Sequence, residues 1–333
     1  MRMWFRPVKG IAFCIVAAFF GSQAMAQVQV KRSFPSAKRI SAFDNTTFCT
    51  AFLSDGSLLT IRDIPIVDLR DVDKIAFNPT GSSLALMRGK KPVSIYSFRD
   101  RNKKLFELKE QRKSKELKGR KNLSFFVPGP VGAELMKDAS KGDIVPVAMC
   151  YGADARNFLV SNSLGEIIVY DTKAYLPQAY IQGKAVATAI TMSPNNYFIA
   201  AGTGKNIDIW NFQTKELRTS LPMPAEVTEL VFSADASQMA VVTADKRLTI
   251  FDTKTWDKVD IFDKIGGTLT SPSFHPDGKY ISVVKDGNAI VIMNLKNSVP
   301  EQTLDENPGG VTGSRFFVNK QTSDVFMLSL IHI

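Results

Sequence analysis

The chain has 333 residues, of which 44% are hydrophobic, and a formal net charge of +10 at pH 7. A chain of this length can bury a large core. Its three cysteines are too few for a disulfide framework, which excludes the class of small secreted scaffolds held together by such bonds.

The first 26 residues have the pattern of a secretory signal peptide. Three basic residues come first: Arg2, Arg6 and Lys9. They are followed by an apolar core, residues 11–20, and by a small-x-small cleavage site, residues 24–26. The apolar core is too short to span a bilayer, and no later stretch is long and apolar enough to be a transmembrane helix. We therefore expect cleavage before Gln27 and export to the periplasm or the outer cell envelope.

The net positive charge of the mature chain comes from one segment. Removal of the signal peptide lowers the formal net charge from +10 to +7, and residues 99–121 alone hold 11 Lys and Arg against 4 acidic residues, which is also +7. The rest of the mature chain is neutral overall. For an exported protein this distribution favours an acidic protein partner or an anionic envelope polymer over nucleic acid.

A unit of about 40 residues recurs along the mature chain. Each copy has a strand that ends in a large residue, a turn resembling Ser-Pro-Asp-Gly, a second apolar strand, and a third strand such as EIIVYD (166–171). The large residues mark the copies: Phe34, Phe77, Tyr151, Met192, Phe232, Phe274 and Phe316. The steps between successive markers are 43, 74, 41, 40, 42 and 42 residues.

Short strands at this period predict an all-β fold. A four-stranded antiparallel unit per copy can bury its faces against its neighbours and close into a β-propeller, which protects the sheet edges. The two-residue alternation and the many Val, Ile, Phe and Tyr residues argue against helical repeats of similar period. We expect a propeller of four-stranded antiparallel blades over residues 27–327, with seven blades of which the last is incomplete.

The units resemble WD40 repeats over about residues 34–326. FHPDGKYI (274–281) and FSADASQMAVV (232–242) are similar to that family's first turn, and IDIWNF (207–212) is similar to its Trp-Asp strand end. The Gly-His pair that opens each WD40 unit is absent, so the family's structural hydrogen-bond tetrad lacks its His. The terminal pair takes four forms: Tyr170-Asp171, Trp210-Asn211, Phe251-Asp252 and Met293-Asn294. The resemblance implies a protein-interaction scaffold that is not an enzyme.

The step of 74 residues contains an insertion of about 33 residues, at about residues 112–143. It follows the last strand of one unit and precedes the first strand of the next. Its Pro and Gly residues favour a loop or a short hairpin rather than a domain.

Residues for catalysis or metal binding are scarce. The mature chain has two histidines, His275 in an F-H-P-D-G turn and His332 near the end, so a Ser-His-Asp site would have to use one of them. We interpret His275 as a turn residue in the place of Ser233 of a sister unit. Cys49, Cys150 and His275 fall in three different units, which argues against a zinc site. We expect no catalytic residue, no metal and no cofactor.

One pattern points to a binding site. In a propeller, the turns between second and third strands lie on the same face as the connections from blade to blade. Four of five such turns are basic, and the insertion adds further charge, so we hypothesise an electropositive binding face made of Arg88, Lys90, Lys91, Lys113, Lys115, Lys118, Arg120, Lys121, Lys205, Lys246, Arg247 and Lys285. The alternative is that these are ordinary solvated turn residues.

The interpretation that follows is a non-enzymatic scaffold of the bacterial cell envelope, which binds protein partners on this loop face. One alternative is a receptor for an anionic glycan or another anionic envelope ligand. A second is the N-terminal propeller of a larger prolyl-oligopeptidase-like hydrolase, with the catalytic domain beyond residue 327. The last six residues, LSLIHI (328–333), equal one reading frame of a transposon-end sequencing adapter. We therefore expect native sequence to stop near Met327.

Overall fold

The computed structural model describes residues 13–18, 20–21, 24–25, 29–30, 49–52, 58–61, 73–79, 82–97, 104–108, 144–305, 311–318 and 325–331. The chain divides into two compact units. Unit 1 comprises Met1–Arg70, Lys246–Leu248 and Asp260–Ile333, and unit 2 comprises Asp71–Asp245 and Thr249–Val259. Marker Phe34 and the basic insertion at 112–143 lie outside the described residues.

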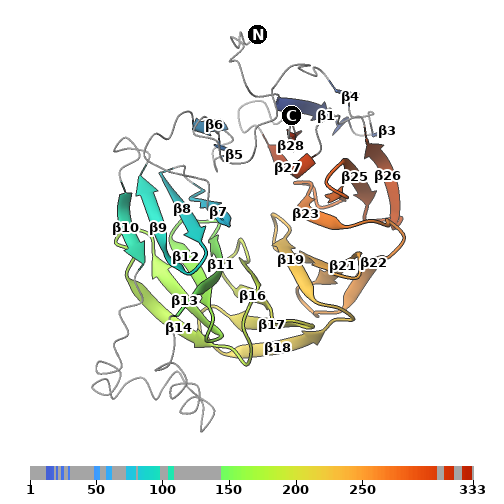
Figure 1. Cartoon of the computed structure of the whole chain (residues 1–333). Helices are drawn as coiled ribbons and strands as arrows, with labels where there is room; N and C mark the ends of the chain where they lie inside the picture. The colour runs from blue at the N-terminus through green and yellow to red at the C-terminus, as the bar shows by residue number, and fades with distance from the viewer. Residues whose placement is uncertain are drawn as a thin grey trace, which may run out of the picture. The chain divides into compact units, whose positions relative to one another are not determined.

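The described chain contains repeated four-stranded antiparallel sheets, as the sequence predicts (Figure 1). In five of them the strands lie in chain order. The first is β7 (Lys74–Phe77), β8 (Ser83–Arg88), β9 (Lys91–Ser97) and β10 (Lys104–Leu108). The second is β11 (Pro146–Tyr151), β12 (Asn157–Asn162), β13 (Glu166–Asp171) and β14 (Pro177–Gln182). The third is β15 (Ala189–Met192), β16 (Phe198–Gly202), β17 (Asn206–Asn211) and β18 (Leu217–Pro222).

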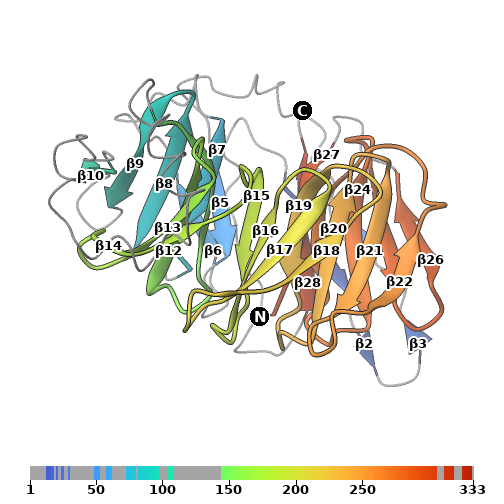
Figure 2. The same cartoon turned by 90° about the horizontal axis from the view of Figure 1, so that it is seen from below.

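The remaining two of these sheets follow the same order (Figure 2). They are β19 (Val227–Phe232), β20 (Gln238–Thr243), β21 (Arg247–Asp252) and β22 (Lys258–Phe262), and then β23 (Leu269–Phe274), β24 (Tyr280–Lys285), β25 (Ala289–Asn294) and β26 (Val299–Leu304). The first strands end at five of the residues that mark the repeat: Phe77, Tyr151, Met192, Phe232 and Phe274. The repeat in the sequence is therefore a repeat of sheets.

A sixth four-stranded sheet joins segments from both ends of the chain. Its order is β27 (Val311–Val318), β28 (Val325–Ile331), β1 (Phe13–Ala18) and β4 (Gln29–Val30). Two short pairs complete the strands: β2 (Phe20–Gly21) with β3 (Ala24–Met25), and β5 (Cys49–Phe52) with β6 (Leu58–Ile61). The predicted signal peptide and adapter-derived tail stay predictions, because strand pairing in the uncleaved chain tests neither.

Within unit 2, the β11–β14 sheet packs against a neighbouring sheet on each of its two faces. On β12, Leu159 packs in a cluster with Met192 and Ile199 of the β15–β18 sheet, whereas its neighbour Phe158 packs with Ala85 and Ile95 of the β7–β10 sheet. Successive side chains on a strand point to opposite faces, so consecutive apolar residues can serve two interfaces. This explains why β8, β12 and β13 are apolar runs rather than alternating strands.

The turns repeat as closely as the strands do. A left-handed residue occurs in each described turn between first and second strands from β11 onward: Ala155, Asn196, Ala236 and Gly278. Another occurs in each turn between third and fourth strands: Tyr175, Lys215, Trp256 and Ser298. Seven of these eight residues are not glycine, although the left-handed region favours glycine. The repeat therefore preserves a backbone path while its side chains differ.

The second residue of the WD-like pair has a defined role in the turn that follows it. Asp171 Oδ1 accepts hydrogen bonds from the backbone N–H groups of Lys173 and Ala174, at 2.9 and 3.0 Å. Asn211 and Asp252 accept the corresponding pair of bonds in their own turns. These bonds lower the pKa of Asp171, and the bond from the N–H of Ala174 has the largest effect. Asp and Asn carry an acceptor that reaches these N–H groups well, which explains their recurrence here, and Ser97 takes the equivalent position in β9.

Neighbouring sheets of unit 2 pack closely at Gly202, where there is no room for a side chain. A Cβ atom at Gly202 would lie 2.7 Å from Cγ1 of Val227, a side chain that is 1% exposed. We predict that Gly202→Ala lowers the free energy of unfolding by about 1–3 kcal/mol, because it overpacks this contact. Urea unfolding should show the loss, and the loss should be smaller when the same change is made in a Val227→Ala background.

Gly204 is the matched control. It has a φ of +64° and nothing within 4 Å of an added Cβ, so Gly204→Ala costs only backbone strain, about 1–2 kcal/mol. Val227→Ala should not relieve that cost. Equal relief for both glycine variants would contradict the packing explanation.

Candidate functional site

Turns and connections meet at one end of the sheets in unit 2. The turn between β12 and β13 contains Gly165, whose carbonyl accepts a hydrogen bond from Gly183 N at 2.9 Å, just after β14 ends. In the next sheet, the carbonyl of Lys205 accepts from Met223 N at 2.8 Å, in the connection to β19. We call this the connection end of a sheet. In unit 1 the β24–β25 turn makes the corresponding contact, from Val311 N to the carbonyl of Gly287.

The described basic residues lie at the connection ends of their own sheets. In unit 2, Arg88 ends β8, Lys91 begins β9, and Lys90 and Lys205 lie in turns; the three lysines are exposed and Arg88 is half-buried. In unit 1, Lys246 is exposed, and Arg247 and Lys285 are half-buried. The insertion residues Lys113, Lys115, Lys118, Arg120 and Lys121 lie outside the described residues. A single electropositive face stays a prediction.

Acidic residues lie at the same end of unit 2, and the sequence analysis did not weigh them. They are Asp73, Glu226, Glu229 and Asp245. Asp73 Oδ2 accepts a hydrogen bond from Gly89 N, in the β8–β9 turn, and the carbonyl of Glu226 accepts from Ala244 N at 2.8 Å. The connection end described in unit 2 is therefore mixed in sign, and its densest positive charge is at the β8–β9 turn. The sequence could have indicated these acids, because the rule that places the basic turns at one end of each sheet also places the acidic residues of the neighbouring turns and connections there.

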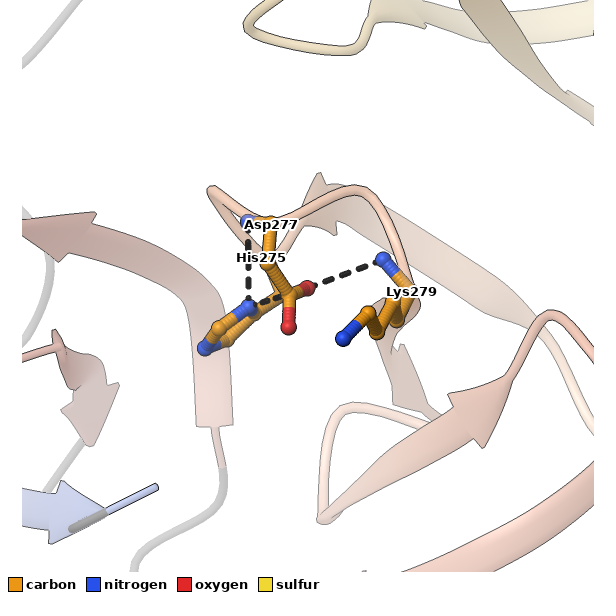
Figure 3. Close-up of polar contacts among 3 residues, drawn as sticks. All are labelled: His275, Asp277 and Lys279. Atoms are coloured by element: carbon orange, nitrogen blue, oxygen red, sulfur yellow. Dashed lines mark hydrogen bonds and ion pairs between the residues drawn. The ribbon is translucent and has the colours of Figure 1, made fainter. Parts of the chain in front are cut away.

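His275 lies at the other end of its sheet, in the turn from β23 to β24 (Figure 3). Its N–H donates to the carbonyl of Tyr280 at 2.8 Å, and its carbonyl accepts from Gly278 N at 2.9 Å. Its Nδ1 lies 2.6 Å from Asp277 Oδ1, which also accepts from Lys279 N at 2.9 Å. The interpretation of His275 as a turn residue is confirmed.

Sister turns identify the protonated nitrogen of His275. In the β19–β20 turn, Ser233 Oγ donates to Asp235 Oδ1 at 2.6 Å, and Ser237 N donates to the same oxygen at 3.0 Å. His275 Nδ1 occupies the place of that hydroxyl, and the Asp277 carboxylate 2.6 Å away can only accept, so we assign the ring proton to Nδ1 and treat the longer 3.2 Å approach of Asp277 N to the same atom as secondary. Burial lowers the pKa of His275 most strongly, while the charge and hydrogen bond of Asp277 oppose this. The neutral ring is therefore a structural donor at pH 7.

The Cys150 thiol is poorly suited to act as a nucleophile. Burial raises the pKa of the Cys150 thiol to about 12, so the thiolate, which is the nucleophilic form, is scarce at neutral pH. Among the described residues no group of three His, Cys, Asp or Glu side chains could hold a metal ion. In the part of the chain that the structure describes, no helix is long and apolar enough to cross a membrane.

One cavity lies between two sheets of unit 2. Its volume is about 30 Å³, and its lining includes Val93, Leu108 and Val160. This space corresponds to about one water molecule, and an apolar lining offers that water few partners. The cavity is too small for an organic ligand.

Comparison with known proteins supports the WD40 resemblance in part. No protein-family model matches the chain. A curated relative, a periodic tryptophan protein 2 homolog of Dictyostelium discoideum, is 29% identical over 132 residues. The match covers 33% of this chain and only 14% of the relative. The chain thus shows weak homology to a WD40 protein, together with repeated four-stranded sheets that are consistent with propeller blades.

Because the ring of His275 is buried, we predict that the free energy of unfolding falls in acid. Its pKa in the folded chain is lower than the value of about 6.5 in the unfolded chain. As pH falls below about 6.5, the unfolded chain takes up this proton first, so the free energy of unfolding declines. We expect His275→Ser, which copies the turn of Ser233, to lose less stability than the parent protein between about pH 7.5 and pH 5.5.

Urea unfolding of both proteins across this range measures the difference. The serine variant keeps a hydrogen-bond donor to Asp277, so the turn itself is preserved in both proteins. A difference in unfolding free energy that does not vary with pH would contradict the assignment.

Proposed function

We propose that this protein is a non-enzymatic, WD40-like β-propeller that binds protein partners at the connection ends of its sheets. The observation that carries this proposal is the repetition of one sheet topology, in which each connection end brings a turn and a connection together. Repeated sheets of this kind present many loops on one rigid frame, an arrangement suited to binding. The WD40 homology indicates a protein-interaction module in general, from a family that is usually not enzymatic.

Charge suggests which partners such a module would select. Exposed lysines at the β8–β9 and β16–β17 turns, Lys90, Lys91 and Lys205, attract acidic surfaces and raise the rate of encounter. Acidic residues nearby, such as Glu226, disfavour a uniformly anionic polymer. An acidic protein surface that also carries some basic residues fits this mixture better, so we favour a protein partner over an anionic glycan.

Charge reversal at the connection end should weaken capture. We predict that Lys90→Glu, Lys91→Glu and Lys205→Glu together reduce capture of partners from envelope extracts by about tenfold or more, or about 1.4 kcal/mol. Immobilised protein and quantitative mass spectrometry of the bound fraction measure this at low and at physiological salt. Reversal of Lys113, Lys115, Lys118, Arg120 and Lys121 in the insertion should have the same effect.

The control variant reverses three exposed lysines near the opposite end of the sheets. Lys173 and Lys254 lie in turns between third and fourth strands, and Lys258 begins β22. Their reversal changes the net charge by the same amount as the test variant. Equal losses in the two variants would show a nonspecific effect of net charge, and no loss in either would remove the proposed face.

We further propose export to the periplasm or outer cell envelope, on the basis of the signal-like residues 1–26. Expression of the chain in a Gram-negative host should yield a product in the periplasmic fraction whose N-terminus is Gln27. N-terminal sequencing of the purified protein tests this. A cytoplasmic product that keeps residues 1–26 would contradict it.

A further inference from the structure

Lys74 is exposed as a whole, but its ammonium group bonds the backbone of two other sheets of unit 2. It is the first residue of β7, and its Nζ donates to two backbone carbonyls, that of Val147 at 3.1 Å and that of Thr188 at 3.2 Å. Val147 lies in β11, and Thr188 immediately precedes β15. One ammonium group therefore joins the first strands of three successive sheets.

The topology explains why carbonyl oxygens are available there. β11 and β15 are the end strands of their sheets, so each has one side without a strand neighbour in that sheet. Backbone groups on such an edge need other partners. The first strands also lie next to one another, β7 beside β11 and β11 beside β15, so carbonyls from two sheets can face the same donor.

Charge around Lys74 favours a cation. Asp73 and Glu229 both act on the Lys74 ammonium to raise its pKa, although desolvation has the larger effect and the pKa is lowered overall. Glu229 occupies in β19 the position that Lys74 occupies in β7, three residues before the marker. The equivalent positions of β11 and β15 hold Ala148 and Ala189, which are too short to compete for the carbonyls.

We propose that the carbonyl oxygens of Val147 and Thr188, with the carboxylate of Glu229, form a binding site for a primary ammonium group, which Lys74 fills. A primary ammonium is compact and has three N–H donors, of which two are used here. The site selects that group because it offers separate single acceptors from two strands, whereas a guanidinium requires a paired, planar arrangement. An amine or a lysine of another molecule would compete with Lys74 for these oxygens.

Chemical rescue tests the site. Lys74→Ala removes the atoms of propylamine from the side chain, so n-propylammonium chloride supplies the missing part. We expect Lys74→Ala to lower the melting temperature by about 2–4 °C and n-propylammonium to restore roughly half of that loss or more. Sodium chloride and tetramethylammonium chloride at the same ionic strength should restore less, because neither has an N–H donor.

Two further variants separate the ammonium from the stem. Lys74→Met keeps the apolar stem and fills its volume, so it should lose stability without rescue by n-propylammonium. Glu229→Gln in the Lys74→Ala background should reduce the rescue. Equal restoration by propylammonium and tetramethylammonium, or a Lys74→Ala variant as stable as the parent protein, would overturn the proposal.

The parent protein provides an independent test if Lys74→Ala does not fold. ¹⁵N NMR of the lysine side chains can measure proton exchange with water at each ammonium. The Lys74 ammonium should exchange several-fold more slowly than that of exposed Lys205, and Glu229→Gln should speed its exchange. Equal exchange at Lys74 and Lys205 would overturn the site.

Discussion

The structure depends on sheets that are apolar on both faces. In unit 2, side chains such as Phe158 and Leu159 are adjacent in sequence and fully buried, yet they serve opposite interfaces. A single sheet of this kind would expose both apolar faces to water, at a cost of about 25 cal/mol for each Å². Stability therefore requires a neighbour on each side, and the repetition of the unit supplies it. The close approach of Gly202 to Val227 follows from the same packing.

This constraint explains why the repeat can diverge in sequence. The residue before the capping Asp or Asn must be large and buried, and Tyr170, Trp210, Phe251 and Met293 all satisfy that requirement. The capping residue is Asp or Asn in four sheets, where its oxygen bonds the next turn, and Ser97 holds the equivalent position in the β7–β10 sheet. Among the described residues Trp210 Nε1 has no hydrogen-bond partner, which agrees with the absence of the tetrad His in the sequence. Such a buried donor costs about 1–3 kcal/mol.

Residue types on the surface are less constrained than those in the core. Turns are solvated, so their charges are free to vary, and the connection end of unit 2 carries both signs. The β8–β9 turn concentrates positive charge, whereas the connection before β19 contains Glu226. Lys74 differs from these residues, because its ammonium bonds two backbone carbonyls instead of water alone. A charged residue at one end of a sheet can thus either stay open to solvent and partners or, like Lys74, bond the backbone of neighbouring sheets.

Local patterns in the sequence were enough for the sheets, because short apolar strands recur at a regular period and the turns between them need residue types with a specific geometry. The markers from Phe77 to Phe274, the turn role of His275 and the positions of Lys90 and Lys205 all follow from that periodicity. The partners of Lys74 could not be predicted, since Val147 and Thr188 are 73 and 114 residues away and their contacts use backbone atoms, which carry no sequence signal. The acids at the connection end could have been placed there by the rule that places the basic turns, but their contacts could not. Groups such as Asp73 and the N–H of Gly89 meet only after β7 and β8 have paired, so only the folded chain decides which charged groups are engaged in bonds and which stay open to a partner.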